Sequence, residues 1–563
     1  MTAFRDYPYR RPDLEKAKEE LAGLADIIRK APDAAAQKEA FLSCGAFCEK
    51  LDSASVIASI RHTADTADPF YAGEIEYYDR MGPLIEDRRL EVYKAMLRSP
   101  FRQELEAQLG PLLFEKMETE VKGSDPAILE LMQKENALET EYQKLYASAR
   151  IPFNGKELTI PQLTYYKQSR DRTVRRAAFC AEGEFFDAHR EEFDRLFDEL
   201  VKNRTAQAQA LGYESFTPLG YIRMKRCGYG PAEVERYRAQ TAEEIVPLIA
   251  RVKEIQKRRI GTEALCLWDD SFYFPDGNAM PSGSAEEILS AGRRMYRELS
   301  PETAEFIDFM FERELFDLLS RPGKAPGGYC TYIPDFKSPF IFSNFNGTSG
   351  DVDVLTHEAG HAFAAYRAAK QKLIPEYSSA SMEICEIHSM SMEFLTSGFR
   401  GLFFGRDAAK YELSHAESAL SFLPYGCMVD EFQHIVYADP GLAPEQRNRA
   451  WLELERKYRP YLDLGDLPFY SRGAGWQRQL HLYECPFYYI DYCLAQTVAF
   501  QLWEAWLKCP ADGWQRYLTL VDLAGTKSFP GLVQSAGLKS PFEPGCLKAL
   551  SQFLEGWIRE NQL

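Results

Sequence analysis

Apolar residues recur at helical spacing through most of this chain. In the first 150 residues helix follows helix, and Leu131, Leu138 and Leu145 repeat every seven positions with Glu and Lys between them. This seam lasts only about three heptads, which favours an amphipathic bundle helix over a long coiled coil. An Asn-Gly pair at 154–155 breaks the pattern, and helical periodicity resumes near residue 165 and continues to about residue 320.

Between residues 328 and 345 the pattern changes to short aromatic and β-branched runs. Tyr329–Ile333 and Pro339–Phe345 are such runs, and the segment PDFKS separates them. They predict a small β-hairpin. The turn NGTSGD follows, and Asp351 or Asp353 is expected to cap the next helix. Helical patterns then continue to the C-terminus, so the predicted fold is mostly α with one small sheet. We expect an N-terminal helical region at 1–150 and a catalytic body at 151–563.

Composition and charge narrow the classes of protein. The 563 residues are 45% hydrophobic and 27% charged, which excludes a mostly disordered chain. The net charge of −17 argues against nucleic acid and against an anionic membrane surface as partners. The N-terminus lacks the apolar core of a secretory signal, and no run of about 18 apolar residues predicts a membrane span. Twelve scattered cysteines without a CxxC pair indicate reduced thiols and a cytoplasmic location.

The helix expected after the hairpin carries the motif His357-Glu358-x-x-His361. Positions four apart lie on one side of a helix, so both imidazoles can bind one zinc ion. Glu358, one residue along, is near enough to reach a metal-bound water without ligating the metal itself. A helix whose two histidines only pair locally is the alternative. Gly360 argues against this alternative, because glycine would weaken a helix with a purely structural role.

A catalytic zinc site needs a third protein ligand, and a segment downstream supplies candidates. Glu383, Glu386 and Glu393 fall on one face of an otherwise apolar helix. Burying three acids is costly unless a cation compensates them, as a divalent metal would. His388 points away from this face and is interpreted as a packing or supporting residue. Spacing alone leaves both Glu383 and Glu386 open as the ligand.

These motifs resemble the M3 zinc oligopeptidases, a family that includes thimet oligopeptidase and the oligoendopeptidase F group. The family motif HExGH is matched from His357 to His361. The family's ligand Glu lies about 29 positions after the first His, with a further acid seven residues on, and Glu386 and Glu393 match these positions. The resemblance therefore implies zinc held by His357, His361 and Glu386. Glu383 and Glu393 become candidates for orienting the histidine ligands.

A third stretch, GAGWQRQLHLYECPFYYIDYCLAQ, strengthens the resemblance. The segments GKELTIPQL and SRDRTVRRAAF also resemble the oligoendopeptidase F branch, so the resemblance spans about residues 150–560. The third stretch contains His481, Tyr488, Tyr489 and Tyr492, and its PFYYIDY string is most similar to the oligoendopeptidase F branch. In the family, a His and tyrosines of this region hydrogen-bond the substrate carbonyl and the tetrahedral intermediate. The resemblance implies this role for His481 and Tyr492, with Tyr489 next. A tyrosine-rich helix that only packs in the core is the alternative.

The resemblance implies a zinc metalloendopeptidase that hydrolyses internal bonds of short unfolded peptides, with two helical lobes around a channel. Glu358 would act as general base and then as general acid. The strand Pro339–Phe345 would either bind the peptide as an added β-strand or only brace the metal helix. A helical metallocarboxypeptidase is the nearest rival, and a non-catalytic peptide carrier with a structural zinc is a more distant one.

Overall fold

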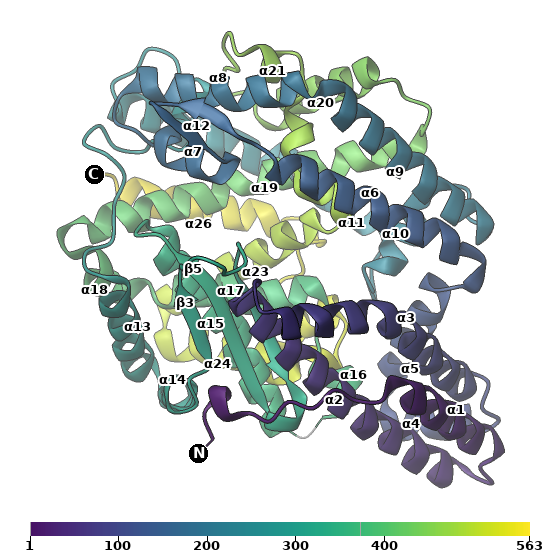
Figure 1. Ribbon diagram of the computed structural model, residues 1–563. Helices are drawn as coiled ribbons and strands as arrows, with labels where there is room; N and C mark the ends of the chain where they lie inside the picture. Colours follow the sequence, from purple (N-terminus) through teal and green to yellow (C-terminus); the bar gives the residue numbers. More distant parts are fainter. Residues whose placement is uncertain (1, 372) are drawn as a thin grey trace. The chain divides into compact units, whose positions relative to one another are not determined.

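The computed structural model describes residues 2–371 and 373–563, and over these residues it confirms a mostly α fold with small sheets (Figure 1). The chain forms two compact units, each assembled from three separate segments. Unit 1 comprises Met1–Lys122, Met280–Arg406 and Ala499–Leu538, and unit 2 comprises Gly123–Ala279, Asp407–Val498 and Lys539–Leu563. Segments far apart in the sequence therefore pack together in each unit.

Unit 1 contains an N-terminal helical bundle and the helices around a three-stranded sheet. Its helices are α1 Leu14–Lys30, α2 Ala34–Ala64, α3 Pro69–Leu97, α4 Arg102–Leu109, α5 Pro111–Gly123, α13 Ala285–Leu299, α14 Pro301–Glu312, α15 Gly350–Lys370, α16 Pro375–Ser378, α17 Met382–Leu395, α18 Gly401–Phe404, α24 Pro510–Leu523 and α25 Phe529–Ser535. Its strands are β3 Phe316–Leu319, β4 Tyr329–Ile333 and β5 Ser338–Phe345.

Unit 2 contains a two-stranded sheet and most of the remaining helices. They are α6 Leu129–Ala147, β1 Ile151–Phe153, β2 Lys156–Leu158, α7 Ile160–Lys167, α8 Arg172–Ala188, α9 Arg190–Ala210, α10 Phe216–Arg223, α11 Pro231–Gln240, α12 Val246–Arg259, α19 Ala408–Ala438, α20 Pro444–Tyr458, α21 Pro468–Ser471, α22 Leu480–Glu484 and α26 Cys546–Glu560. The helix α23, Tyr489–Lys508, begins in unit 2, and its residues from Ala499 onward belong to unit 1.

Helix α1 illustrates how the apolar pattern builds the N-terminal bundle. Leu21, Ala25 and Ile28 lie on one face and are fully buried in the core that α1 forms with α2 to α5. The side chain of Asp13 caps the helix by accepting a hydrogen bond from the backbone of Lys16. Among the described residues, no helix combines the length and the apolar character needed to cross a membrane.

The predicted β-hairpin is confirmed. Strands β4 and β5 pair antiparallel with Ile333 opposite Ser338, and Lys337 closes the turn in a left-handed conformation with a φ of 47°. The expected helix cap is wrong, because α15 begins after Ser349 rather than after either aspartate. Asp351 instead stabilises the preceding turn, since its carboxylate accepts hydrogen bonds from the backbone of Asn346 and Gly347.

Strand β5 is the central strand of its sheet, which has the order β3-β5-β4. It pairs parallel with β3, where Phe316 lies opposite Ile341, and antiparallel with β4 along its other edge. Strand β4 pairs with Ser338–Phe342 and β3 pairs with β5 between Ile341 and Phe345, so β5 is an internal strand of the sheet. This position argues against binding of a peptide by β-addition to β5. The alternative interpretation is supported, since α15 packs against β5 and β4 (Figure 1).

Candidate metal centre

Two packed helices of unit 1 bring the predicted ligands together. His357 and His361 lie one turn apart on α15, and Glu386 lies on α17. One ligand atom from each of these three residues lies within 4.8 Å of the others. Over residues 2–371 and 373–563 this is the group of His, Cys, Asp and Glu side chains whose spacing suits a metal ion. The fold therefore packs the helix that carries the HExxH motif against the helix that carries the predicted third ligand.

Gly360 explains why these two helices can approach so closely. A Cβ atom at this position would lie 2.5 Å from the backbone oxygen of His388 and 2.6 Å from Cα of Ser389. Both contacts are with backbone atoms of α17, which cannot move aside as a flexible side chain can. The sequence marked Gly360 only as a weak point in the helix, whereas the structure uses it to bring α15 against α17.

The three ligand side chains form one polar cluster. His357 Nε2 lies 3.3 Å and His361 Nε2 3.8 Å from Oε2 of Glu386. The other ring nitrogen of His357, Nδ1, lies 2.7 Å from Oε1 of Glu393. Ser389 donates a hydrogen bond of 3.1 Å to Oε2 of Glu386. The contact of His357 with Glu393 fixes the orientation of the ring, which is how supporting carboxylates usually hold metal-binding histidines.

Burial and carboxylates set the protonation of the two histidines. Burial disfavours a charged His357, but its hydrogen bonds with Glu386 and Glu393 raise the pKa well above its ordinary value. Burial lowers the pKa of His361 to about 4, so this ring is neutral at pH 7 and its nitrogen can donate a lone pair. A cation between these groups would replace the proton that His357 otherwise holds between two carboxylates.

The donor set fits a zinc ion. Zinc binds imidazole nitrogen and carboxylate oxygen at about 2.0–2.2 Å, so a tetrahedral site separates its ligand atoms by about 3.3–3.6 Å. The two nitrogen-to-oxygen separations of 3.3 and 3.8 Å are close to that spacing. Two His and one carboxylate also leave a fourth position for water or substrate, as catalytic zinc sites require. Calcium and magnesium, which prefer all-oxygen ligands, fit less well.

Glu358 lies between the two histidines in sequence and is half-buried. Burial is the main reason that its pKa rises to about 7, and the nearby carboxylates Glu386 and Glu393 raise it further. A carboxylate with a pKa near neutrality can both accept and release a proton at physiological pH. This is the property that a general base acting on water needs.

The remaining candidates on α17 are buried but lie outside the ligand group. Glu383 is fully buried and does not belong to the three-residue cluster, so the structure favours Glu386 over Glu383 as the third ligand. His388 is buried as well, and Tyr517 donates a hydrogen bond of 3.0 Å to its backbone oxygen. Burial lowers the pKa of His388 to about 3, which is consistent with a neutral packing residue.

The predicted oxyanion donors form a second cluster, which lies in unit 2. The ring of His481 lies 4.8 Å from that of Tyr489, 5.7 Å from that of Tyr488 and 5.9 Å from that of Tyr492, measured between centroids. Tyr488 and Tyr492 are 4.8 Å apart. We call His481, Tyr488, Tyr489 and Tyr492 the ring cluster. The structure therefore brings these four residues together, and it brings the metal ligands together in unit 1.

A glutamine that the sequence did not single out orients His481. Gln479 Nε2 lies 2.9 Å from His481 Nδ1, and Tyr425 donates a hydrogen bond of 2.9 Å to Gln479 Oε1. An amide nitrogen only donates, so His481 Nδ1 accepts and the proton of the neutral ring sits on Nε2. In that tautomer Nε2 is a hydrogen-bond donor. No spacing rule points to Gln479, because Tyr425 comes from the distant helix α19.

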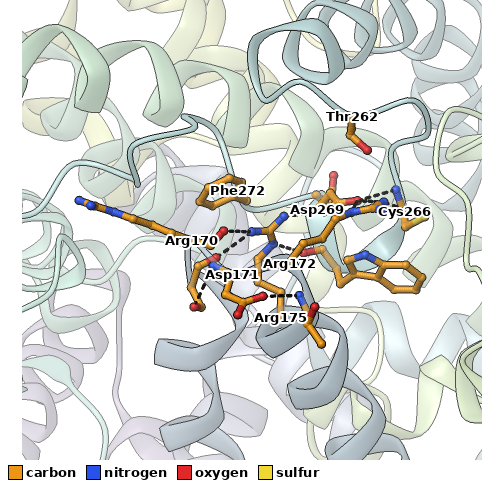
Figure 2. Close-up of polar contacts among 12 residues, drawn as sticks. Arg170, Asp171, Arg172, Arg175, Thr262, Cys266, Asp269 and Phe272 are labelled. Carbon is orange, nitrogen blue, oxygen red and sulfur yellow. Dashed lines mark hydrogen bonds and ion pairs between the residues drawn. The ribbon is translucent and has the colours of Figure 1, made fainter.

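The segment SRDRTVRRAAF, which contributed to the resemblance, has a structural role at the start of α8 (Figure 2). Arg172 and Arg175 both donate to the buried carboxylate of Asp269, at 2.7 Å each. The guanidinium of Arg175 also stacks on Phe272, 3.9 Å from its centroid. Figure 2 shows Arg170 pointing away from this group. These paired arginines hold the loop after α12, so they do not form a site dedicated to a substrate carboxylate.

Comparisons with known proteins identify the relatives of the chain. The sequence profile described as "Peptidase M3 N-terminal domain" matches residues 4–124. The profile described as "Peptidase family M3" matches residues 165–288 and 302–552. The N-terminal region, to which the resemblance did not extend, is thus also a recognised part of this family.

Individual relatives agree with these profiles. PZ peptidase A, solved with an inhibitor, shares 46% identity and a TM-score of 0.93 over 99% of each chain. Oligoendopeptidase F from Enterococcus faecium, at 16% identity, has a TM-score of 0.61 over 98% of each chain and supports the fold alone. Group B oligopeptidase PepB from Streptococcus agalactiae is 22% identical over 68% of this chain, and the match spans 63% of that relative's length.

Proposed function

Because this chain belongs to peptidase family M3, we propose that it is a zinc-dependent endopeptidase that hydrolyses internal bonds of short unfolded peptides. The observation that carries the proposal is the convergence of His357, His361 and Glu386 on one point, with Glu358 beside them. Sequence relatives named oligopeptidase and oligoendopeptidase F support the substrate class.

Zinc is the proposed metal, held by His357, His361 and Glu386. When bound, a zinc ion supplies a Lewis acid that lowers the pKa of water and stabilises charge on the scissile carbonyl. Glu358 would accept the proton of the attacking water and then deliver it to the leaving amine. Glu393 keeps His357 oriented through the 2.7 Å contact with Nδ1.

The ring cluster is proposed to stabilise the oxygen that gains negative charge. Nε2–H of His481 and the hydroxyl of Tyr492, with Tyr489 next, would donate hydrogen bonds to that oxygen. This role requires the ring cluster to contact the peptide whose carbonyl carbon water attacks. Removing one such donor typically costs about 10²–10³ in turnover, so Tyr492→Phe should lower kcat by that factor while zinc stays bound. An unchanged kcat would move the role to Tyr488 or Tyr489, which Tyr488→Phe and Tyr489→Phe test directly.

A quenched fluorescent peptide, assayed with and without a chelator, tests the activity. We expect cleavage that the chelator abolishes and added zinc restores. Glu358→Gln should retain zinc by elemental analysis and lose nearly all hydrolysis. Retained hydrolysis in this variant would refute the assignment of the base. A failure of the zinc-loaded protein to cleave peptides of any length would refute the enzyme and leave the peptide-carrier alternative.

Two further comparisons separate the alternatives. A peptide with a blocked C-terminus is cleaved by an endopeptidase and resists a carboxypeptidase, so its cleavage decides between these classes. For the metal ligands, Glu386→Ala should lose zinc and Glu383→Ala should keep more of it, because only Glu386 lies in the ligand group. The reverse order would exchange the roles of the two glutamates.

We also propose that the protein acts in the cytoplasm. All twelve cysteines are free, from Cys44 to Cys546, as expected where thiols are kept reduced. Fractionation of cells with compartment markers tests this, and recovery of the protein outside the cytoplasmic fraction would contradict it.

A further inference from the structure

Phe487 has a backbone conformation that bulky residues rarely adopt. It lies in the left-handed region with a φ of 67°, and its side chain is fully buried. Most residues avoid this region because Cβ then crowds the following carbonyl oxygen. Such residues persist where their surroundings over-determine them, and they gather at functional sites. Tyr488 follows Phe487 directly, and α23 starts at Tyr489, so Phe487 immediately precedes the three tyrosines of the ring cluster.

Two buried side chains bind both backbone polar groups of Phe487. Its N–H donates to Oε1 of Gln433 at 2.6 Å, and its carbonyl oxygen accepts from Nη2 of Arg226 at 2.5 Å. Gln433 belongs to α19, and Arg226 follows α10. Hydrogen bonds from a charged donor, such as that from Arg226, are among the stronger ones, and both side chains are buried. The conformation of Phe487 is therefore held from two distant segments of unit 2.

The same arginine also holds the first turn of α23. Nη2 of Arg226 pairs with Oδ1 of Asp491 at 2.6 Å, and both side chains are buried, with exposed fractions of 1% and 0%. The guanidinium group of Arg226 thus links Phe487, two residues before α23, to Asp491 in the first turn of this helix. Tilting α23 at its start would break this link and leave a buried charge poorly compensated, which is costly.

The ring of Phe487 is fixed by close packing. A Cβ atom at Gly220 would lie 2.5 Å from Cδ2 of this ring, so only glycine leaves room for it. The ring lies 5.1 Å from that of His434 and 5.4 Å from that of Tyr221, measured between centroids. Contacts therefore restrain both the backbone and the side chain of Phe487. They also restrain the direction in which the chain enters α23.

We propose that Arg226 and Gln433 are positioning residues that hold Phe487 left-handed and so set Tyr489 and Tyr492 against His481. The importance of this placement for catalysis rests on the proposed function, in which the ring cluster donates to the oxyanion. Displacing a positioned group by about 1 Å can cost about 10²-fold in rate.

Two pairs of matched variants test the proposal. Arg226→Lys and Gln433→Met weaken the hold on Phe487, and we expect kcat to fall about ten- to a hundredfold with KM and zinc content unchanged. The control Arg259→Lys alters a buried ion pair elsewhere in unit 2, in which Nη2 lies 2.5 Å from Oε2 of Glu417. The control Gln256→Met removes a buried amide that donates to three backbone carbonyls elsewhere in unit 2. Both controls should keep the wild-type kcat although they cost stability.

A second readout does not depend on activity. With 3-fluorotyrosine placed at position 489, the ¹⁹F resonance should shift in Arg226→Lys and Gln433→Met and stay in place in the two controls. Wild-type kcat and an unshifted resonance in both test variants would overturn the proposal, as would equal losses of kcat in the controls. If the wild-type protein cleaves no peptide, the proposed function fails, and the ¹⁹F comparison still decides whether Arg226 and Gln433 hold Tyr489 in place.

Discussion

Replacing Gly360 by alanine should separate the two helices that carry the metal ligands. The new Cβ would lie 2.5 Å from the backbone oxygen of His388, and ordinary contact begins at 3.4 Å, so α17 would have to move by about 0.9 Å. Overpacking of this kind costs about 1–3 kcal/mol, whereas the gain in helix propensity from Gly to Ala is about 1 kcal/mol. The free energy of unfolding should therefore fall by about 0–2 kcal/mol, which leaves the protein folded.

The effect on metal binding should be larger than the effect on stability. Glu386 Oε2 lies 3.3 Å from His357 Nε2, close to the spacing that a tetrahedral zinc site requires. Metal–ligand distances tolerate changes of only about 0.2 Å, so a shift of about 0.9 Å would weaken or lose one ligand. We expect zinc affinity to fall at least about 10–100-fold, measured by competition with a chromogenic chelator.

The control for this variant is Gly23→Ala. Gly23 lies inside α1, is exposed, and has open space where a Cβ would be added. The substitution should stabilise the protein by about 1 kcal/mol and leave zinc affinity unchanged. Wild-type zinc affinity in Gly360→Ala would refute the argument, because it would mean that the contact between α15 and α17 does not position the ligands.

Three further predictions concern the groups around the two clusters. Glu393→Gln should lower zinc affinity about 10–100-fold, because His357 loses its charged acceptor; unchanged chelator competition would contradict this. Gln479→Leu should lower kcat by up to about 10² and change the ¹⁵N tautomer signature of the adjacent histidine, and identical spectra would argue against its role. Burial opposes ionisation of Glu135, but its ion pairs with Arg204 and Arg223 lower its pKa to about 2. The unfolded pKa is about 4.3, so this stabilisation of about 3 kcal/mol is complete above about pH 5 and lost as the pH falls toward 2. Urea unfolding of metal-free Glu135→Gln should therefore depend less on pH between 5 and 2 than wild type, and an equally steep dependence would contradict the assignment.

Local patterns in the sequence predicted the features that depend on neighbouring residues. The hairpin of β4 and β5 follows from two β-branched, aromatic runs separated by a short turn, and the structure pairs Ile333 with Ser338. The two imidazoles of His357 and His361 follow from helical spacing, and the structure places both at the same point. These predictions succeeded because the responsible contacts lie within a few residues of one another.

Features that depend on distant segments could not be predicted from the sequence. Spacing left Glu383 and Glu386 open, because the choice depends on how α17 packs on α15, and the structure groups Glu386 with His357 and His361. Peptide addition to β5 and bracing of the metal helix both stayed open, because the sequence did not show that β3, a separate run beginning at Phe316, pairs with β5. The segments that make up each unit were not predicted, because each unit contains three stretches of chain that are far apart in sequence.

Gly360 and Phe487 show two ways in which the chain departs from local preference beside a functional cluster. Glycine is unfavourable inside a helix, and a buried aromatic residue is unfavourable at positive φ. Each departure is compensated by contacts from elsewhere: α17 packs against Gly360, while Arg226 and Gln433 bind Phe487. The sequence itself shows the unfavourable residue at position 360, because a glycine inside a predicted helix is visible from its identity. The conformation of Phe487 is invisible in the sequence, because its identity fits an ordinary core position and only the segments that bind its backbone impose the strain.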